Sequence, residues 1–247
     1  MGACVAFIIS VATLCKKEGY LSFYHKSIWT LRRNVIKPIL KVGSSAFVEQ
    51  AFMRIGFFAY AAIIARLGTT SYSTHLICMN ILSLSFSFGD GLSVAASALV
   101  GQNLGAKRPD LSLVYGKTGQ RLAFMISTVV FFIFMFGGRF LVSLFSSEQN
   151  IIYLGARIMF LASFFTHAQT SQMVMSGCLR GAGDAAYTAV TSFISIALIR
   201  PFLTWLLCFP LGLDLYGAWI ALGIDQLFRL IVSITRFSGG KWASITL

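Results

Sequence analysis

Two carboxylates interrupt long apolar stretches of this sequence, where charge is costly. Glu49 and Asp90 lie within the apolar segments 39–66 and 72–100. A charge at the bilayer centre costs about 2.5–3.5 kcal/mol on insertion scales, so such side chains face the protein interior or a water-filled cavity. Glu49 lies ten residues after Ile39, and Asp90 lies eleven residues before Gly101. If the two helices are antiparallel and rise 1.5 Å per residue, the carboxylates lie about 15 and 17 Å above the same membrane surface. Neighbouring carboxylates can share a proton or bind a cation, which predicts a cation-coupling pair. Alternatively, each carboxylate pairs with an intramembrane arginine and only holds helices together.

Four other charges within apolar segments are predicted to be structural. Asp225 and Arg229 are four residues apart, which places them one turn apart on a helix and favours an ion pair. Arg54 and Arg200 are assigned to the same structural class.

A polar stripe in the fourth apolar segment is the candidate lining of a substrate cavity. Ser163, Thr166, His167 and Thr170 recur at i, i+3, i+4 and i+7, which places them on one helical face. Gln50, beside Glu49, joins this candidate set. Hydrogen bonding between helices would explain the same stripe equally well.

The elements that must position these residues are membrane-spanning helices. Of the 247 residues, 57% are hydrophobic and 11% are charged. A hydrocarbon core about 30 Å thick requires roughly 20 apolar helical residues, and backbone groups in lipid must be paired within the segment. The predicted fold is therefore all-α and polytopic. The segments that meet these conditions are 39–66, 72–100, 122–145, 151–178, 186–209 and 215–236.

The basic residues predict the orientation in the membrane. When the loops alternate between two sides, fourteen of the 20 Lys and Arg fall on one side, two on the other and four inside helices. The positive-inside rule makes the rich side cytoplasmic and places the C-terminus there. Because these charges lie at membrane-facing loop ends, the partner they indicate is membrane lipid and nucleic acid is excluded.

The first 38 residues differ from the rest. Residues 1–15 are apolar but too short to cross a membrane comfortably, and their basic residues follow rather than precede them, unlike a signal peptide. We interpret them as the tail of a preceding transmembrane helix. Residues 16–38 form a basic connector, either a helix on the inner membrane surface or a solvated linker. Residues 39–247 are predicted to form the six-helix unit with a short cytoplasmic tail.

Motifs for catalysis and cofactor binding are missing from the sequence. The five cysteines show no metal-ligand or redox spacing, and there is no phosphate loop or nucleophile elbow. The sequence therefore predicts a protein that is not an enzyme and that has no cofactor or metal.

Two blocks resemble the multidrug and toxic compound extrusion (MATE) family of transporters. The first is LVGQNLGA at 99–106, followed by KRPD, and the second is LRGAGD at 179–184, followed by Arg200-Pro201. Glu49-Gln50 with Arg54 resembles the opening helix of the family's C-terminal lobe. Asp225 and Arg229, with the Gly-Lys-Trp of the tail, are similar to its last helix.

The resemblance implies one six-helix lobe of a twelve-helix, two-lobe antiporter in the cytoplasmic membrane of a prokaryote. It implies export of cationic drugs and other toxic organic compounds, driven by H⁺ or Na⁺, with Glu49 as the coupling residue. Asp90 rests on the depth argument alone. The partner would be a missing N-terminal lobe or a second copy of the chain. Two alternatives are a lipid-linked sugar flippase of the same superfamily and a truncated membrane fragment without transport activity.

Overall fold

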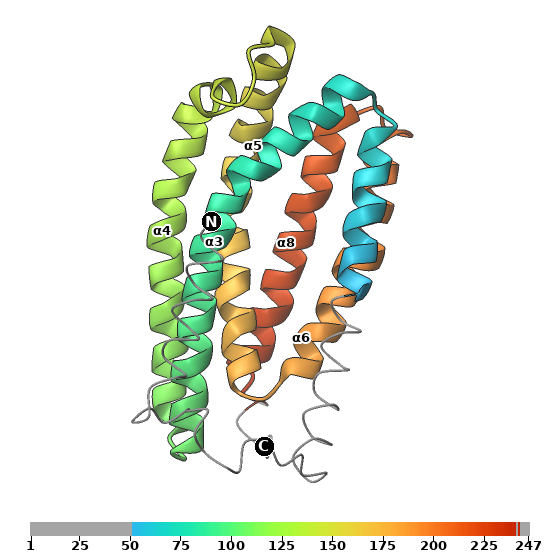
Figure 1. Ribbon diagram of the computed structural model, residues 1–247. Coiled ribbons are helices and arrows are strands. Elements are labelled where there is room, and N and C mark those ends of the chain that lie inside the picture. Colours follow the sequence, from blue (N-terminus) through green and yellow to red (C-terminus); the bar gives the residue numbers. More distant parts are fainter. Residues whose placement is uncertain (1–50, 241, 243–247) are drawn as a thin grey trace, which may run out of the picture. The chain divides into compact units, whose positions relative to one another are not determined.

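Long helices make up the part of the chain that the computed structural model describes, residues 51–240 and 242 (Figure 1). A helix over Ala51–Ala65 comes first. It is followed by α3 (Thr69–Gly105), α4 (Pro109–Ser143), α5 (Gln149–Gly181), α6 (Ala185–Ser192), the π-helical segment η2 (Phe193–Ile199), α7 (Arg200–Cys208) and α8 (Asp214–Ser238).

Five of these helices are long and apolar enough to cross a membrane, counting α6, η2 and α7 as one helix over Ala185–Cys208. They follow the predicted spans in order. Ala51–Ala65 belongs to the first predicted span, 39–66, whose first part lies outside the described residues, as do segments 1–15 and 16–38. The structure lengthens α4 most, because it begins at Pro109 rather than near residue 122. Hydropathy measures the membrane-spanning part of a helix, and the charged first turns of α4 extend beyond it.

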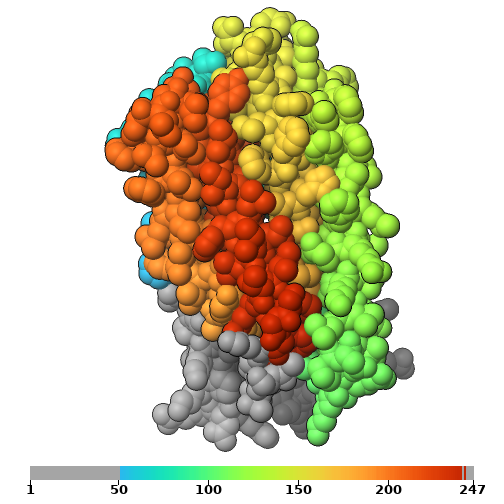
Figure 2. All heavy atoms as spheres, turned by 180° about the vertical axis from the view of Figure 1, so that it is seen from behind, coloured from blue at the N-terminus to red at the C-terminus, as the bar shows by residue number. Residues whose placement is uncertain are grey.

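Helix α5 lies at the centre of this unit and packs against α3, α4, α6 and α8. Seen from the opposite side, the red α8 lies between the orange helix of residues 185–208 and the yellow-to-orange α5 (Figure 2). Large apolar side chains point outward from the surrounding helices, among them Phe58 and Phe136, each 76% exposed. Such exposure is expected where the surrounding solvent is lipid.

Glycines allow α3 and α5 to approach backbone to backbone. A Cβ on Gly181 would lie under 3.0 Å from three backbone atoms of Ser97, and one on Gly177 would similarly clash with Ser93. A Cβ on Gly101 would lie 2.9 Å from the carbonyl oxygen of Gly181. The two blocks that carry the family resemblance are therefore in direct contact, and their glycines set the distance between the helices.

The π-helical segment η2 changes the direction of side chains halfway along its helix. The backbone N–H of Arg200 bonds to the carbonyl of Ser195, five residues back, and Pro201 next to it has no N–H to donate. Ser195 and Arg200 consequently both point toward α8. Gly56 lets the first helix approach this irregular backbone, since a Cβ there would lie 2.5 Å from the carbonyl oxygen of Ile196.

Side chains near the end of α8 fasten it to its surroundings. Arg236 Nε donates to Asp184 Oδ2 at 2.7 Å. Asp184 directly follows Gly183, whose φ of +86° marks the turn between α5 and α6. The buried Trp242 ring stacks on Phe237 with centroids 5.0 Å apart, and its Nε1 donates to the Phe237 carbonyl at 2.6 Å.

Candidate functional site

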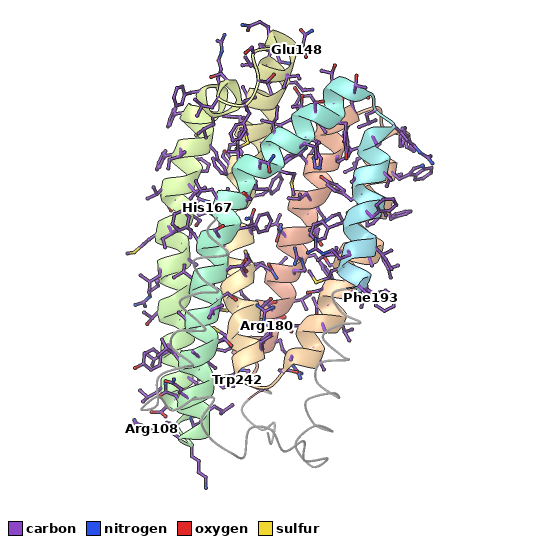
Figure 3. The ribbon with its side chains drawn as sticks, in the orientation of Figure 1. Arg108, Glu148, His167, Arg180, Phe193 and Trp242 are labelled. Carbon is purple, nitrogen blue, oxygen red and sulfur yellow. The ribbon has the colours of Figure 1, made fainter. Side chains whose placement is uncertain are left out.

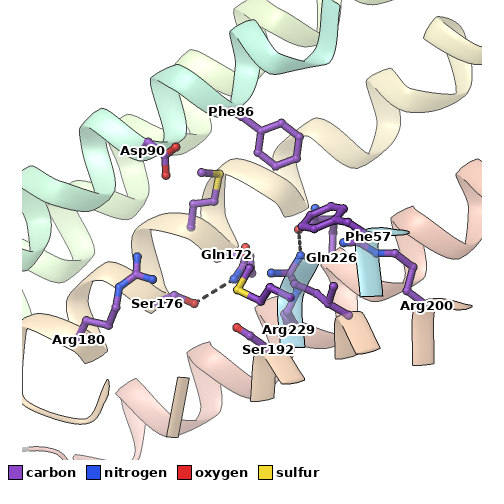
Figure 4. A pocket seen from close by; sticks show the side chains of 13 residues that line it. Phe57, Phe86, Asp90, Gln172, Ser176, Arg180, Ser192, Arg200, Gln226 and Arg229 are labelled. Carbon is purple, nitrogen blue, oxygen red and sulfur yellow. Dashed lines mark hydrogen bonds between the residues drawn. The ribbon is translucent and has the colours of Figure 1, made fainter. Parts of the chain in front are cut away.

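A polar cavity of about 300 Å³ lies inside this helical unit (Figure 4). Every described helix except α4 contributes at least one lining residue, and the walls combine charged, amide, hydroxyl, aromatic and thioether groups. The lining residues are Met53, Phe57, Phe86, Asp90, Gln172, Met173, Ser176, Arg180, Ser192, Ile196, Arg200, Gln226 and Arg229.

The wall formed by α7 and α8 is organised around one buried carboxylate, that of Asp225. Arg200 donates to Asp225 Oδ2 through both Nε, at 3.1 Å, and Nη2. Arg229 Nη2 donates to the same oxygen at 3.1 Å, and the Ser195 hydroxyl donates to Oδ1. A buried charge requires a partner and further hydrogen bonds, and this carboxylate has both.

Amide side chains extend this polar wall. Arg229 Nη2 also donates to Gln226 Oε1 at 3.0 Å, so the guanidinium bridges Asp225 and Gln226. On α5, Gln172 Nε2 donates to Ser176 Oγ at 3.0 Å, and Ser176 Oγ lies 3.4 Å from Ser233 Oγ of α8. Hydrogen bonds therefore hold the amide and hydroxyl groups of this wall in fixed orientations.

Asp90 of α3 and Arg180 of α5 line the cavity from two neighbouring helices (Figure 4). Arg180 Nη2 donates to Ser93 Oγ at 3.1 Å, three residues after Asp90 on α3. Asp90 itself is exposed and has no ion-pair partner among the described residues. A carboxylate in this position remains available to a proton or a cation.

The predicted coupling pair is only half described. Asp90 lines the cavity, whereas Glu49 and its neighbour Gln50 lie outside the described residues. Arg54, predicted to be a structural charge, is exposed and has no ion-pair partner within residues 51–240. The spacing of four between Asp225 and Arg229 predicts contact, and the structure has that ion pair with Arg200 as a third member.

The predicted cavity face of α5 requires correction. Ser163, Thr166 and Thr170 are buried, and their hydroxyls donate to backbone carbonyls three or four residues earlier in the same helix. Hydroxyl side chains in helices commonly bond in this way, and the bond leaves the group with no need of a cavity.

His167 also lies away from the cavity. Its Nε2 is 3.1 Å from Thr128 Oγ1 of α4, and its ring packs against Phe124 and Phe131 of that helix. Figure 3 shows His167 well apart from Arg180 along the molecule. The interhelical hydrogen bond left open as the alternative is the arrangement that this side chain adopts.

The face of α5 that does line the cavity carries Gln172, Ser176 and Arg180. These residues recur at i, i+4 and i+8, so the same periodicity argument would have found them. Arg200 was assigned only a structural role, yet it both pairs with Asp225 and lines the cavity. Its position depends on η2, which has no clear sequence signal apart from Pro201.

Comparisons with curated proteins find transporters, several of them named as multidrug resistance proteins. "Probable multidrug resistance protein NorM" of Thermotoga maritima is 29% identical over 98% of this chain and 53% of its own length. The protein of that name from Idiomarina loihiensis is 33% identical over 73% of this chain and 38% of its own length. The chain spans about half the length of the curated relatives that it matches over most of its own length.

Solved structures show the same fold. A MATE transporter in the straight conformation matches with a TM-score of 0.83 and 19% identity, over 96% of this chain and 54% of its own. A transporter from Pyrococcus furiosus, described as having a binding pocket of reverse polarity, matches with a TM-score of 0.81 and 18% identity, over 99% of this chain and 55% of its own. The MatE family model matches residues 45–206, more than half of the sequence. The chain belongs to the MATE family of membrane transporters.

Proposed function

We propose that this chain acts as the C-terminal lobe of a cation-coupled antiporter that exports toxic organic compounds, cationic ones among them. The observation that carries the proposal is a cavity lined by Asp90 and three arginines within helices that otherwise face lipid. Charged groups are costly at membrane depth and mark pathways for substrates and ions. The names of the relatives support multidrug export as the class of function.

Coupling would depend on Glu49 and Asp90. Met53 lines the cavity, and Glu49 precedes it by four residues, so a helix over the predicted span 39–66 would carry both on one face. In the proposed cycle these carboxylates take up H⁺ or Na⁺ from outside the cell. Such binding drives export only if the ion has different affinities for the outward-open and inward-open states.

The basic loops support a cytoplasmic C-terminus in the cytoplasmic membrane of a prokaryote. In this orientation the connection between α3 and α4, with Lys107 and Arg108, faces the cytoplasm. The proposed complete transporter pairs this lobe with an N-terminal lobe or with a second copy.

A flux assay tests the coupling. The complete protein is reconstituted into liposomes loaded with ethidium, an H⁺ or Na⁺ gradient is imposed, and dye movement is followed by fluorescence. Glu49→Gln should abolish gradient-driven flux. Glu148→Gln, the same change at an exposed carboxylate between α4 and α5, should leave it intact. Full flux through the Glu49 variant would remove the coupling role.

A lipid-linked sugar flippase is the second candidate, because Arg180, Arg200 and Arg229 all line the cavity and suit an anionic precursor. Its test uses the same liposomes. Inhibition of transport by a polyprenyl pyrophosphate, with no response to cationic compounds, would favour the flippase.

A further inference from the structure

A second cleft, of about 500 Å³, is formed by α4, α5 and α8 and shares no lining residue with the polar cavity. Its walls are mostly aromatic and aliphatic, with Tyr153, Phe160 and Tyr216 among them. Of the described residues that line it, two are charged, and both are arginines: Arg139 of α4 and Arg157 of α5. Two cations beside apolar walls indicate an occupant that is anionic at one point and apolar elsewhere.

Glycines bring α4 and α5 together beside the two arginines. A Cβ on Gly138 would lie 2.9 Å from Cβ of Met159, and one on Gly155 would clash in the same way with a side chain of α4. Gly138 directly precedes Arg139, and Gly155 precedes Arg157 by two residues. The close approach of the two helices therefore places both guanidinium groups in the walls of one cleft.

Both arginines are exposed, and neither forms an ion pair with a carboxylate of residues 51–240. Arg157 Nη2 donates to the hydroxyl of Tyr153 one turn earlier, and its guanidinium carbon lies 4.2 Å from the centre of that ring. A phenol supplies an acceptor and an aromatic face but no counter-charge. The positive charge of the cleft is therefore not neutralised by the described part of the chain.

The carboxylates nearest in the fold or in sequence do not fill this role. Glu148 and Asp214 lie at the starts of α5 and α8, outside the cleft lining, and form no ion pair within the described residues. Two further carboxylates lie outside the described residues. Glu49 is predicted to share a helical face with Met53 of the polar cavity, and Glu18 belongs to the connector predicted at the cytoplasmic surface.

The arginines lie near the end of the molecule at which α4 and α5 are connected, where Figure 3 labels Glu148. Arg139 comes four residues before the end of α4, and Arg157 eight residues after the start of α5. These positions are about 6 and 12 Å from the helix ends. Exposed rings such as Phe136 and Phe160 surround them, as expected in lipid. Long basic side chains at such depths reach toward the membrane surface, where lipid phosphates lie.

The charges of the cleft discriminate between kinds of phospholipid. Anionic and zwitterionic phospholipids both carry a phosphate, which accepts strong hydrogen bonds from guanidinium groups. The described lining has no carboxylate to pair with the ammonium group of a zwitterionic lipid. A headgroup whose only charge is negative therefore complements the two arginines best, as in other basic pockets between membrane-spanning helices.

We propose that this cleft binds an anionic phospholipid from the leaflet that meets the connection between α4 and α5. Its phosphate lies between Arg139 and Arg157, and an acyl chain follows Phe160 and Ile220 toward the membrane interior. The orientation given under the proposed function makes this the outer leaflet. The lipid site itself depends neither on that orientation nor on the proposed antiport.

A titration with two lipids that differ only in their headgroups tests the site. The complete protein in detergent is titrated with dioleoylphosphatidylglycerol or dioleoylphosphatidylethanolamine, and native mass spectrometry counts the bound lipids. Phosphatidylglycerol should occupy the first site at least about tenfold more tightly, since each basic residue near the surface favours an anionic lipid. Equal affinities would overturn the proposal, and they are also the result expected if a partner lobe covers the cleft.

The soluble headgroup distinguishes a lipid from a free phosphate compound. Glycerol 3-phosphate carries the phosphate but no acyl chain, so it cannot use the apolar walls. It should not displace phosphatidylglycerol even in large excess. Displacement would identify a site for soluble phosphates and would contradict the assignment of a lipid.

Variants locate the binding at the two arginines. Arg139→Gln and Arg157→Gln should each weaken phosphatidylglycerol binding about fivefold, and the double variant about thirtyfold, with little change for phosphatidylethanolamine. Arg66→Gln is the matched control, because it removes an exposed arginine that is predicted for the same side of the membrane and does not line the cleft. An equal loss in the Arg66 variant would show that general positive charge, and not this cleft, attracts the lipid.

Lysine at both positions keeps the charge and guards against variants that fold poorly. The double variant Arg139→Lys, Arg157→Lys should still prefer phosphatidylglycerol, because an ammonium group also binds phosphate. Loss of the preference would contradict the electrostatic account. The assay uses no ion gradient, so a failure of ethidium flux would leave the lipid site in place, and equal lipid affinities would leave the proposed antiport in place.

Discussion

Arg200 and Arg229 donate to a single oxygen, Oδ2 of Asp225, from two different helices. This shared acceptor joins α7 to α8 behind the cavity, and it is buried completely. The strength of such an arrangement is most visible when one partner is removed, because the remaining charges stay buried.

Asp225→Asn should destabilise the protein strongly. The change leaves two buried guanidinium groups without a counter-charge, for which the cost is about 3–5 kcal/mol. Thermal unfolding in detergent, followed by tryptophan fluorescence, measures the effect. Asp214→Asn is the matched control on the same helix: Asp214 is exposed, and asparagine tolerates its φ of 45°. Equal unfolding temperatures for the two variants would show that the buried cluster contributes no stability.

Gly181→Ala should weaken the contact between α3 and α5. The new methyl group would meet backbone atoms of Ser97, which can move only with their helix, and overpacking of this kind costs about 1–3 kcal/mol. Gly91→Ala is the control, because nothing lies within 4 Å of a Cβ there and alanine is favoured over glycine inside a helix by roughly 0.5–1 kcal/mol. The two substitutions should shift the unfolding temperature in opposite directions.

Trp242→Ala should loosen the end of α8. It removes the stacking on Phe237 and the hydrogen bond to the Phe237 carbonyl. Hydrogen exchange of residues 235–238 should become faster, while exchange in the middle of α8 stays unchanged. Trp205→Ala, at a half-exposed tryptophan of α7, should leave the end of α8 protected. Unaltered exchange in the Trp242 variant would contradict a fastening role for the tail.

The three described cysteines should resist labelling in the folded protein. Cys78, Cys178 and Cys208 are free and buried. In a background with Cys4→Ser and Cys15→Ser, a water-soluble maleimide should add nothing before denaturation and three groups after it. Ser147→Cys, in the exposed connection between α4 and α5, should react at once and shows that the reagent is active. Labelling of the folded background would contradict the packing described for these helices.

The spans were predictable from sequence because lipid imposes a simple rule on length and polarity. Asp225 and Arg229 were predictable as a pair because both stand on one helix at a spacing of one turn. Arg200 was not, because it lies 25 residues away from Asp225 and reaches it only through the geometry of η2.

The cavity face of α5 was missed for a related reason. A polar stripe predicts a polar environment only if its groups need external partners. The hydroxyls of Ser163 and Thr170 bond to backbone carbonyls of their own helix, whereas the longer Gln172 side chain bonds to another side chain, that of Ser176. The still longer Arg180 side chain reaches Ser93 on α3. Weighting polar residues by side-chain length would have favoured the second stripe.

The glycine contacts between α3 and α5 have a mechanical consequence. Where two helices touch through their backbones, no layer of side chains lies between them that could rearrange when one helix slides or tilts against the other. We therefore expect α3 and α5 to move together as one rigid body. Asp90 lies on α3 and Arg180 lies on α5, so this rigid pair carries both residues into the cavity lining. We therefore expect a conformational change that reshapes the cavity to occur in the wall formed by α6, η2 and α7, where the π-helical turn interrupts the regular helix.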